Sequence, residues 1–215
     1  MQISIFDDDS VEYAIRQIPS YESHNLILTK HYAKRLPSIT HAFCLLRFGK
    51  LAGVCTFGTP SSSTLLKGIC GERFADKVLE LNRLVLTENL SNEASRLVAG
   101  SLKLLPKPKI VVSYADTAQS HIGLVYQACN FLYTGLSTKF LDPVVQGLEH
   151  QHHATYAHGL TNAQVIEKYG KENVTFVERS RKHRYIIFIG SKRERKEFKK
   201  NLKYSVLPYP KGLSS

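Results

Sequence analysis

The chain has 215 residues, a formal net charge of +11 and 43% hydrophobic residues. This composition excludes an intrinsically disordered chain, and the length predicts a single domain that spans residues 1–215. No run of about 18 apolar residues is present and the start MQISIFDDDS is acidic, so we expect no membrane span and no signal peptide. The four cysteines lack C-x-x-C spacing and lie among apolar residues, which predicts reduced, buried thiols in a cytoplasmic protein and not a zinc site.

Hydrophobic periodicity and turn residues divide the first two thirds of the chain into helices and strands. The first half of this part predicts a short strand and a helix in 4–18, a short helix in 20–38, a hairpin in 41–58 around Gly49-Lys50 and a polar loop in 59–73. After it we expect a strand in 77–86 and a helix in 91–105 that is capped by Ser91 or Asn92. A strand in 109–116, a helix in 121–129 and an aromatic strand after Phe131 follow. In the strand 77–86, Leu79, Leu81 and Arg83 alternate with Glu80 and Asn82.

The last third of the chain contains a basic portion over about 160–205, and it also alternates between helices and strands. We expect a helix in 161–170 capped by Asn162 and stopped by Gly170, two strands in 173–190 around a basic turn, a charged helix in 191–202 and an irregular tail in 204–215. The whole order predicts an α/β or α+β protein with a mixed sheet flanked by helices.

A ligand site is expected where the strand 109–116 ends. Sheets of this kind bind ligands at the carboxyl ends of strands, where neighbouring strands splay apart. Asp116 lies at such an end, and Arg83 lies within the preceding strand of the chain. Next to them, His121 and Gly123 open a helix whose N-terminus could bind an anion, although plain capping would use the same residues.

Positive charge is concentrated in residues 179–203, where eleven Lys and Arg stand against Glu194 and Glu197 and leave a net charge of +9. This density predicts a polyanionic partner, nucleic acid before an acidic membrane, although a solvated surface could have the same composition. The side chains expected to contact DNA phosphates are Arg179, Arg181, Lys182, Arg184, Lys192, Arg193, Arg195 and Lys196.

Four histidines in the segment EHQHHATYAH invite a metal-binding interpretation. They are His150, His152, His153 and His158. Their spacing fits neither one helix face nor one strand face, and no cysteine is near, so we expect no metal there.

One motif resembles the GNAT acyltransferase superfamily. Many members have a helical Tyr followed, four and five residues later, by Gly-Phe at the turn into a strand. Here Tyr126 precedes Asn130-Phe131 at that spacing, and Asn is the usual substitute for Gly in a left-handed conformation. The hairpin LLRFGKLAGVCTFG resembles the central hairpin of the superfamily, and ELNRLVL resembles its fourth strand. The resemblance implies a GNAT-like, mostly antiparallel central sheet.

Residues 25–190 also resemble the Mom family of phage Mu-type DNA adenine-modification proteins. The matching motifs, in the same order, are TKHY, LNRLVL, SYAD, G-x-V-Y-Q-A-C-N-F-x-Y-T-G and RKHRYI. The resemblance implies a transferase that converts adenine in double-stranded phage DNA to N6-carbamoylmethyladenine. This modification would shield the DNA from restriction enzymes in the host cytoplasm.

The expected phosphate-binding loop departs from the acyltransferase pattern. Acetyltransferases have an R/Q-x-x-G-x-G/A loop whose backbone N–H groups bind the pyrophosphate of coenzyme A at a helix N-terminus. Here that place has the sequence TENLSNEASRL, which contains two acids and no glycine. Ser91, Asn92 and Ser95 could still donate hydrogen bonds, so acetyl-CoA or another acyl donor stays open.

The same resemblance suggests roles for five residues. Tyr126 would be the general acid, Asp116 would orient the attacking amine or accept its proton, and Arg83 would contact a phosphate or carbonyl. His31 and Tyr32 would contact the flipped base, or bind iron together with Asp116. The alternatives are a core Tyr, an Asx turn at Asp116, an Arg83–Asp116 ion pair and a solvated His31.

An adenine that reacts must leave the base stack, and Tyr32, Tyr114 and Tyr133 are candidates to stack on it. Two further functions stay open: a conventional acetyltransferase of a protein or small amine, and a non-catalytic DNA-binding protein. The basic segment argues against the first, and the polar residues at one sheet end argue against the second. In N6-carbamoylmethyladenine, N6 is joined to a methylene carbon, whereas attack of N6 on a thioester carbonyl would give an amide. The sequence therefore leaves open by which reaction the bond between N6 and the methylene carbon forms.

Overall fold

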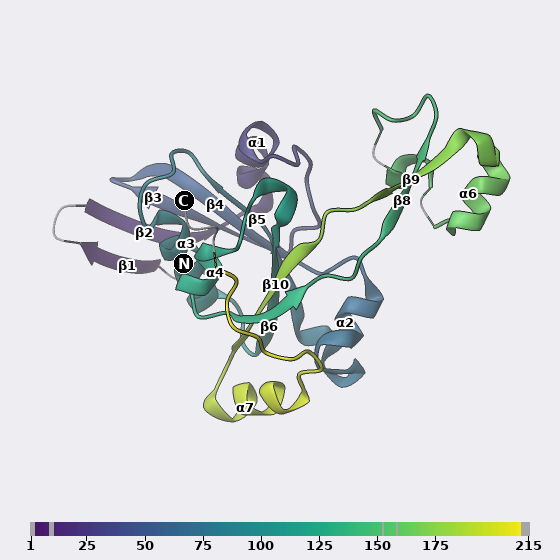
Figure 1. Cartoon of the computed structure of the whole chain (residues 1–215). Coiled ribbons are helices and arrows are strands. Elements are labelled where there is room, and N and C mark those ends of the chain that lie inside the picture. Colours follow the sequence, from purple (N-terminus) through teal and green to yellow (C-terminus); the bar gives the residue numbers. More distant parts are fainter. Residues whose placement is uncertain (1–2, 9–10, 152, 158, 212–215) are drawn as a thin grey trace.

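A mixed sheet of eight strands forms the centre of the computed structural model, which describes residues 3–8, 11–151, 153–157 and 159–211 (Figure 1). The strand order is β1-β2-β3-β4-β5-β6-β10-β7. The strands are β1 (Ile3–Asp8), β2 (Val11–Ile18), β3 (His41–Arg47), β4 (Lys50–Gly58), β5 (Val78–Leu86), β6 (Lys109–Asp116), β7 (Leu132–Leu136) and β10 (Lys182–Ile189). Only β5 and β6 pair in parallel. The mixed, mostly antiparallel sheet predicted from the sequence is thereby confirmed.

Helices cover both faces of this sheet. On one face lie α3 (Glu93–Leu104) and α4 (Leu124–Ala128), and on the other lie α1 (Ser20–Lys30), α2 (Ser63–Cys70) and α7 (Lys192–Asn201). Side-chain alternation in β3 shows both contacts: Phe43 packs with Leu97 of α3, and Cys44 packs with Ile27 of α1.

Two of the predicted elements have the wrong type. The helix predicted in 4–18 is strand β2, in which Tyr13 and Ile15 are buried while Glu12 is exposed, so the true period is two. The loop predicted in 59–73 contains helix α2, because the Ser62 side chain accepts the N–H of Leu65 and caps it.

Turn residues explain several element ends. Phe48 and Gly49 both have positive φ and make the β3–β4 turn, one residue before the expected Gly49-Lys50. Asn130 has the left-handed conformation expected of it, with φ 60°. The helix expected in 121–129 starts only at Leu124, and Thr161, not Asn162, caps helix α6 (Asn162–Tyr169).

A second, two-stranded sheet stands away from the main sheet (Figure 1). It consists of β8 (Leu141–Val145) and β9 (Val174–Glu178), and α5 (His153–Tyr156) and α6 accompany it. Their own apolar cluster contains Val145, Ala157, Val165 and Val174. The two strands expected in 173–190 are present, but β9 pairs with β8 and not with β10. We call residues 138–181 the projection.

Candidate active site

The one parallel strand pair creates the cavity that holds the candidate active site. Strands β5 and β6 pair only as far as Leu81 and Ser113, while β6 stays paired with β10 up to Asp116 and Lys182. Beyond Leu81 and Ser113 the two strands diverge, and a cavity of about 750 Å³ opens between them. The end of α1, the segment 119–126, and Asn89 and Ala94 near the start of α3 also line it.

A β-bulge at Asn82 determines which β5 side chains lie together. Thr56 pairs with Arg83 and Phe57 pairs with Leu81, so Asn82 is an extra residue. Before the bulge Leu79 and Leu81 pack towards α3, whereas after it Leu84 does so. The prediction that Arg83 lies on the same face of the strand as Leu79 and Leu81 is therefore wrong. The shift puts Arg83 on the same side of the strand as Glu80.

All five residues proposed for catalysis line this one cavity: His31, Tyr32, Arg83, Asp116 and Tyr126. Tyr126 is 8% exposed, and burial raises the pKa of its phenol well above the usual value while the Ser113 hydroxyl opposes that rise. The Tyr126 side chain is thus a protonated hydrogen-bond donor at neutral pH.

Arg83 brings a positive charge into the cavity without a carboxylate partner among the described residues. Its Nη1 donates to the backbone oxygen of Asn82 at 2.6 Å and its Nη2 donates to that of Arg35 at 3.2 Å. Its Nε is buried without a hydrogen-bond partner in the same part of the chain. Burial lowers the pKa of Arg83, and the positive charge of Arg35 adds to this.

Asp116 pairs with a different cation from the one considered in the sequence. Its Oδ2 lies 3.5 Å from Nζ of Lys182, and its Oδ1 accepts the N–H of Ala118 at 3.0 Å. Of the two alternatives considered for Asp116, the structure has the Asx turn. Asp116 pairs with Lys182, and the ion pair with Arg83 is not formed. The antiparallel register of β6 and β10 brings Lys182 opposite Asp116.

His31 and Tyr32 form a stacked pair at the cavity, with ring centroids 4.4 Å apart and Tyr32 51% exposed. Burial, Arg83 and His121 lower the pKa of His31 to about 4, so its imidazole is neutral at pH 7. Its Nδ1 accepts the N–H of Ala33 at 3.0 Å.

An iron site is not supported. His31 offers only Nε2, and both carboxylate oxygens of Asp116 already have partners. Within the described residues, no three His, Cys, Asp or Glu side chains are grouped to hold a metal. Of the histidines in 149–158, His152 and His158 lie outside those residues.

The expected cofactor residues are divided by the fold. His121 and Gly123 line the cavity, whereas Ser91, Asn92 and Ser95 are not among its lining residues. Gly123 has φ 78°, and a Cβ there would lie 2.4 Å from the Tyr185 ring. Its missing side chain therefore accommodates Tyr185.

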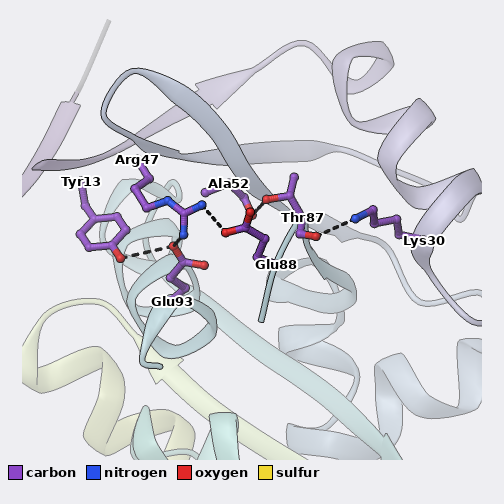
Figure 2. A network of polar contacts seen from close by, with 7 residues as sticks. All are labelled: Tyr13, Lys30, Arg47, Ala52, Thr87, Glu88 and Glu93. Carbon is purple, nitrogen blue, oxygen red and sulfur yellow. Dashed lines mark hydrogen bonds and ion pairs between the residues drawn. The ribbon is translucent and has the colours of Figure 1, made fainter. Parts of the chain in front are cut away.

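The N-terminus of α3 carries a carboxylate of its own (Figure 2). Glu93 is fully buried and accepts hydrogen bonds from the Tyr13 hydroxyl at 3.3 Å and from Arg47 Nη1 at 3.1 Å. Arg47 also pairs with Glu88. The network comprises Tyr13, Lys30, Arg47, Ala52, Thr87, Glu88 and Glu93.

This arrangement does not fit a coenzyme A pyrophosphate. Helix N-termini bind anions because their free N–H groups and dipole are positive, and Glu93 already offsets that charge. Glu93 and Glu88 share Arg47 as their cation, so two carboxylates and one guanidinium lie at this helix end.

The fold separates the expected DNA-binding residues into two sets. Arg179 pairs with Asp142 in the projection, Arg184 donates to Thr134 Oγ1 at 2.9 Å, and Arg181 donates to the Ser137 backbone oxygen. Lys182 lines the cavity. The set on α7 is largely exposed and comprises Lys192, Arg193, Arg195 and Lys196.

Glu80 is a charged cavity residue that the sequence-based assignment missed. Glu80 lines the cavity, and its carboxyl group has no hydrogen-bond partner among the residues that the structure describes. A charged residue between Leu79 and Leu81 in a central strand was the available signal.

Comparison with known proteins finds similar structures and a similar sequence. A solved acetyltransferase from Bacillus subtilis in complex with CoA is 12% identical in sequence and has a TM-score of 0.45, and the match covers 84% of this chain and 100% of that chain. Arabidopsis thaliana NAA60 in complex with a bisubstrate analogue is also 12% identical and has a TM-score of 0.48, and the match covers 83% of this chain and 98% of that chain. The curated methylcarbamoylase Mom of Escherichia phage Mu is 27% identical over 216 residues, which are 94% of this chain and 85% of that protein. The family model of the Mom protein family matches residues 12–211, so the chain belongs to that family.

No helix in the described part of the chain is long and apolar enough to cross a membrane.

Proposed function

We propose that this protein transfers a carbamoylmethyl group to N6 of adenine in double-stranded phage DNA, within the host cytoplasm. The modification would protect the DNA from host restriction enzymes. The observation that carries the proposal is the convergence of Tyr126, Arg83, Asp116 and the His31–Tyr32 pair on one cavity, in a chain of the Mom family. The methylcarbamoylase activity named for the phage Mu relative supports it.

The DNA would lie on the basic side of the molecule. Salt-dependent contacts of Lys and Arg with phosphates supply most of the affinity of such complexes and carry no sequence information. Residues 179–203 supply a net charge of +9. Within them Lys182 lines the cavity, whereas the exposed cations of α7 follow the other end of β10.

The target adenine would be flipped out of the stack into the cavity. Tyr32 is half exposed beside the cavity and already stacked on His31, so it offers a ring face to an extruded base. His31 stays neutral at pH 7 and therefore does not repel Arg83.

In the transfer step, Tyr126 would protonate the leaving group of the donor and Arg83 would bind a carbonyl or phosphate oxygen. Asp116 would hold Lys182 and the segment after β6 in place, through its two contacts. The donor would carry the carbamoylmethyl carbon on a leaving group and would occupy the cavity. Acetyl-CoA by itself lacks the amide nitrogen of that group, so a further nitrogen-containing reactant would be needed with it.

The test is nucleoside mass analysis of DNA from cells that express the protein and from cells that do not. We expect an adenosine heavier by a carbamoylmethyl group only in the expressing cells. Unmodified nucleosides together with newly acetylated cell proteins or amines would favour a conventional acetyltransferase. DNA binding without any modification would favour a non-catalytic DNA-binding protein.

A further inference from the structure

The Glu80 carboxyl group is an unused acceptor inside the cavity. The bulge at Asn82 puts it on the same side of β5 as Arg83, and both line the cavity. Asp116, the other acid there, is already engaged by Lys182 and by the N–H of Ala118. Both Asp116 oxygens thus have a partner, whereas the Glu80 carboxyl group has no hydrogen-bond partner among the described residues.

The charged and titratable groups around Glu80 come from four elements. They are Arg83 on β5, Tyr114 on β6, Lys182 on β10 and Tyr126 on α4. Burial raises the pKa of Glu80, whereas Lys182 and Arg83 lower it and favour the carboxylate. A carboxylate with raised proton affinity beside a bound substrate is suited to accept a proton.

The exocyclic amine of adenine needs such an acceptor. Its lone pair is delocalised into the ring, so N6 attacks an electrophile well only if its proton is withdrawn as the new bond forms. Among flipped bases, the amine is also the group that distinguishes adenine from unsubstituted purine, and enzymes read it by hydrogen bonds to the Watson–Crick edge.

We propose that Glu80 is the catalytic residue that binds the N6 amine of the target adenine and accepts its proton, an inference that rests on the proposed function. N6 forms a bond to the transferred carbon of an activated donor, and the bond from that carbon to its leaving group breaks. The N6 proton passes to Glu80, and the leaving group takes the proton of Tyr126. Both side chains return to their starting states by proton exchange with water.

The first test compares DNA from cells that express Glu80→Gln with DNA from cells that express the unaltered protein at equal levels. Glutamine accepts the N6–H hydrogen bond but not the proton. We expect modified adenosine to fall by about a hundredfold or more, within the range for general bases. Glu72→Gln, the same change at an exposed acid outside the cavity, should leave modification unchanged. Equal modification by Glu80→Gln would overturn the inference.

A second test needs only the purified protein and one variant. The affinity of the unaltered protein is measured for two short duplexes that carry one unpaired base, adenine in the first and purine in the second. The amine should improve binding by about tenfold, as expected for a hydrogen bond to a charged group, and Glu80→Leu should remove the difference. Equal affinity of the unaltered protein for both duplexes would contradict the role of Glu80.

The two proposals fail in different ways. If the unaltered protein produces no modified adenosine, the proposed function is wrong. If it does, and Asp116→Asn but not Glu80→Gln abolishes the product, then Asp116 is the proton acceptor and the inference about Glu80 is wrong.

Discussion

At the scale of single residues, burial sets the protonation states in the cavity. Tyr126 keeps its proton because its phenol is desolvated, and His31 stays neutral because burial and Arg83 lower its pKa to about 4. A proton donor and an uncharged aromatic pair thus lie in the same cavity as the cation Arg83.

Tyr126→Phe is the most direct test of the donor. It removes one oxygen and leaves the ring contacts with Phe131 and Tyr185, so the fold should persist. We expect modified adenosine to decrease by roughly tenfold to a thousandfold, as for loss of a general acid. Tyr21→Phe, at an exposed position of α1, is the matched control. Normal modification by the Tyr126→Phe protein would exclude this phenol from the mechanism.

At the scale of elements, the helix α7 is the clearest candidate to contact DNA. Strand β10 runs antiparallel to β6, so α7 begins beyond Ile189, at the end of β6 that is opposite to Asp116. Phe198 attaches the helix to the core, and most of its basic side chains face solvent. By contrast, Arg184 of β10 makes intramolecular hydrogen bonds and also stacks on Tyr204.

We therefore predict that replacing Lys192, Arg193, Arg195 and Lys196 by Gln weakens binding to duplexes of any sequence. The slope of log affinity against log salt should flatten by roughly 0.9 for each DNA phosphate that the variant no longer neutralises. Thermal unfolding should change little, because these side chains are largely exposed. Replacing Lys50, Lys103, Lys107 and Lys139 by Gln removes the same charge elsewhere and is the control. A slope unchanged by the α7 substitutions would show that DNA binds elsewhere.

At the scale of the whole molecule, the projection joins the main sheet at one place. The Ser137 N–H donates to the backbone oxygen of Lys182 at 2.8 Å, and the Lys182 N–H donates to Ser137 Oγ at 3.0 Å. The chain thus leaves and re-enters the sheet at adjacent residues. The cluster Val145, Ala157, Val165 and Val174 is too small to expect independent folding. We propose that the chain is a single domain from which the projection extends.

Replacing residues 139–180 by Asn-Gly should leave a folded protein, because a short turn can join the antiparallel strands β7 and β10. We expect the shortened protein to unfold in one cooperative transition when its unfolding is monitored by circular dichroism. The cavity residues stay in the shortened chain, so their arrangement should persist. Loss of cooperative unfolding would show that the projection is part of the folding unit, and an unaltered protein purified in parallel is the reference.

The sequence by itself determined the mixed sheet, the family and the five residues proposed for catalysis that line the cavity. Tyr126 lies in a helix and Asp116 lies at the end of a strand. Both elements can be predicted from neighbouring residues in the sequence, so the positions of these two residues in the fold could be predicted as well. The strand β2 was mistaken for a helix because its identity depends on the partner strands that bury Tyr13 and Ile15.

Only the tertiary structure decided which polar groups meet. The Asp116–Lys182 pair follows from the register of β6 and β10, which are distant in the chain. The position of Glu80 beside Arg83 follows from the bulge at Asn82, where the pairing with β4 shifts by one residue. Register and bulges are set by contacts between distant segments, so no local pattern in the sequence specifies them.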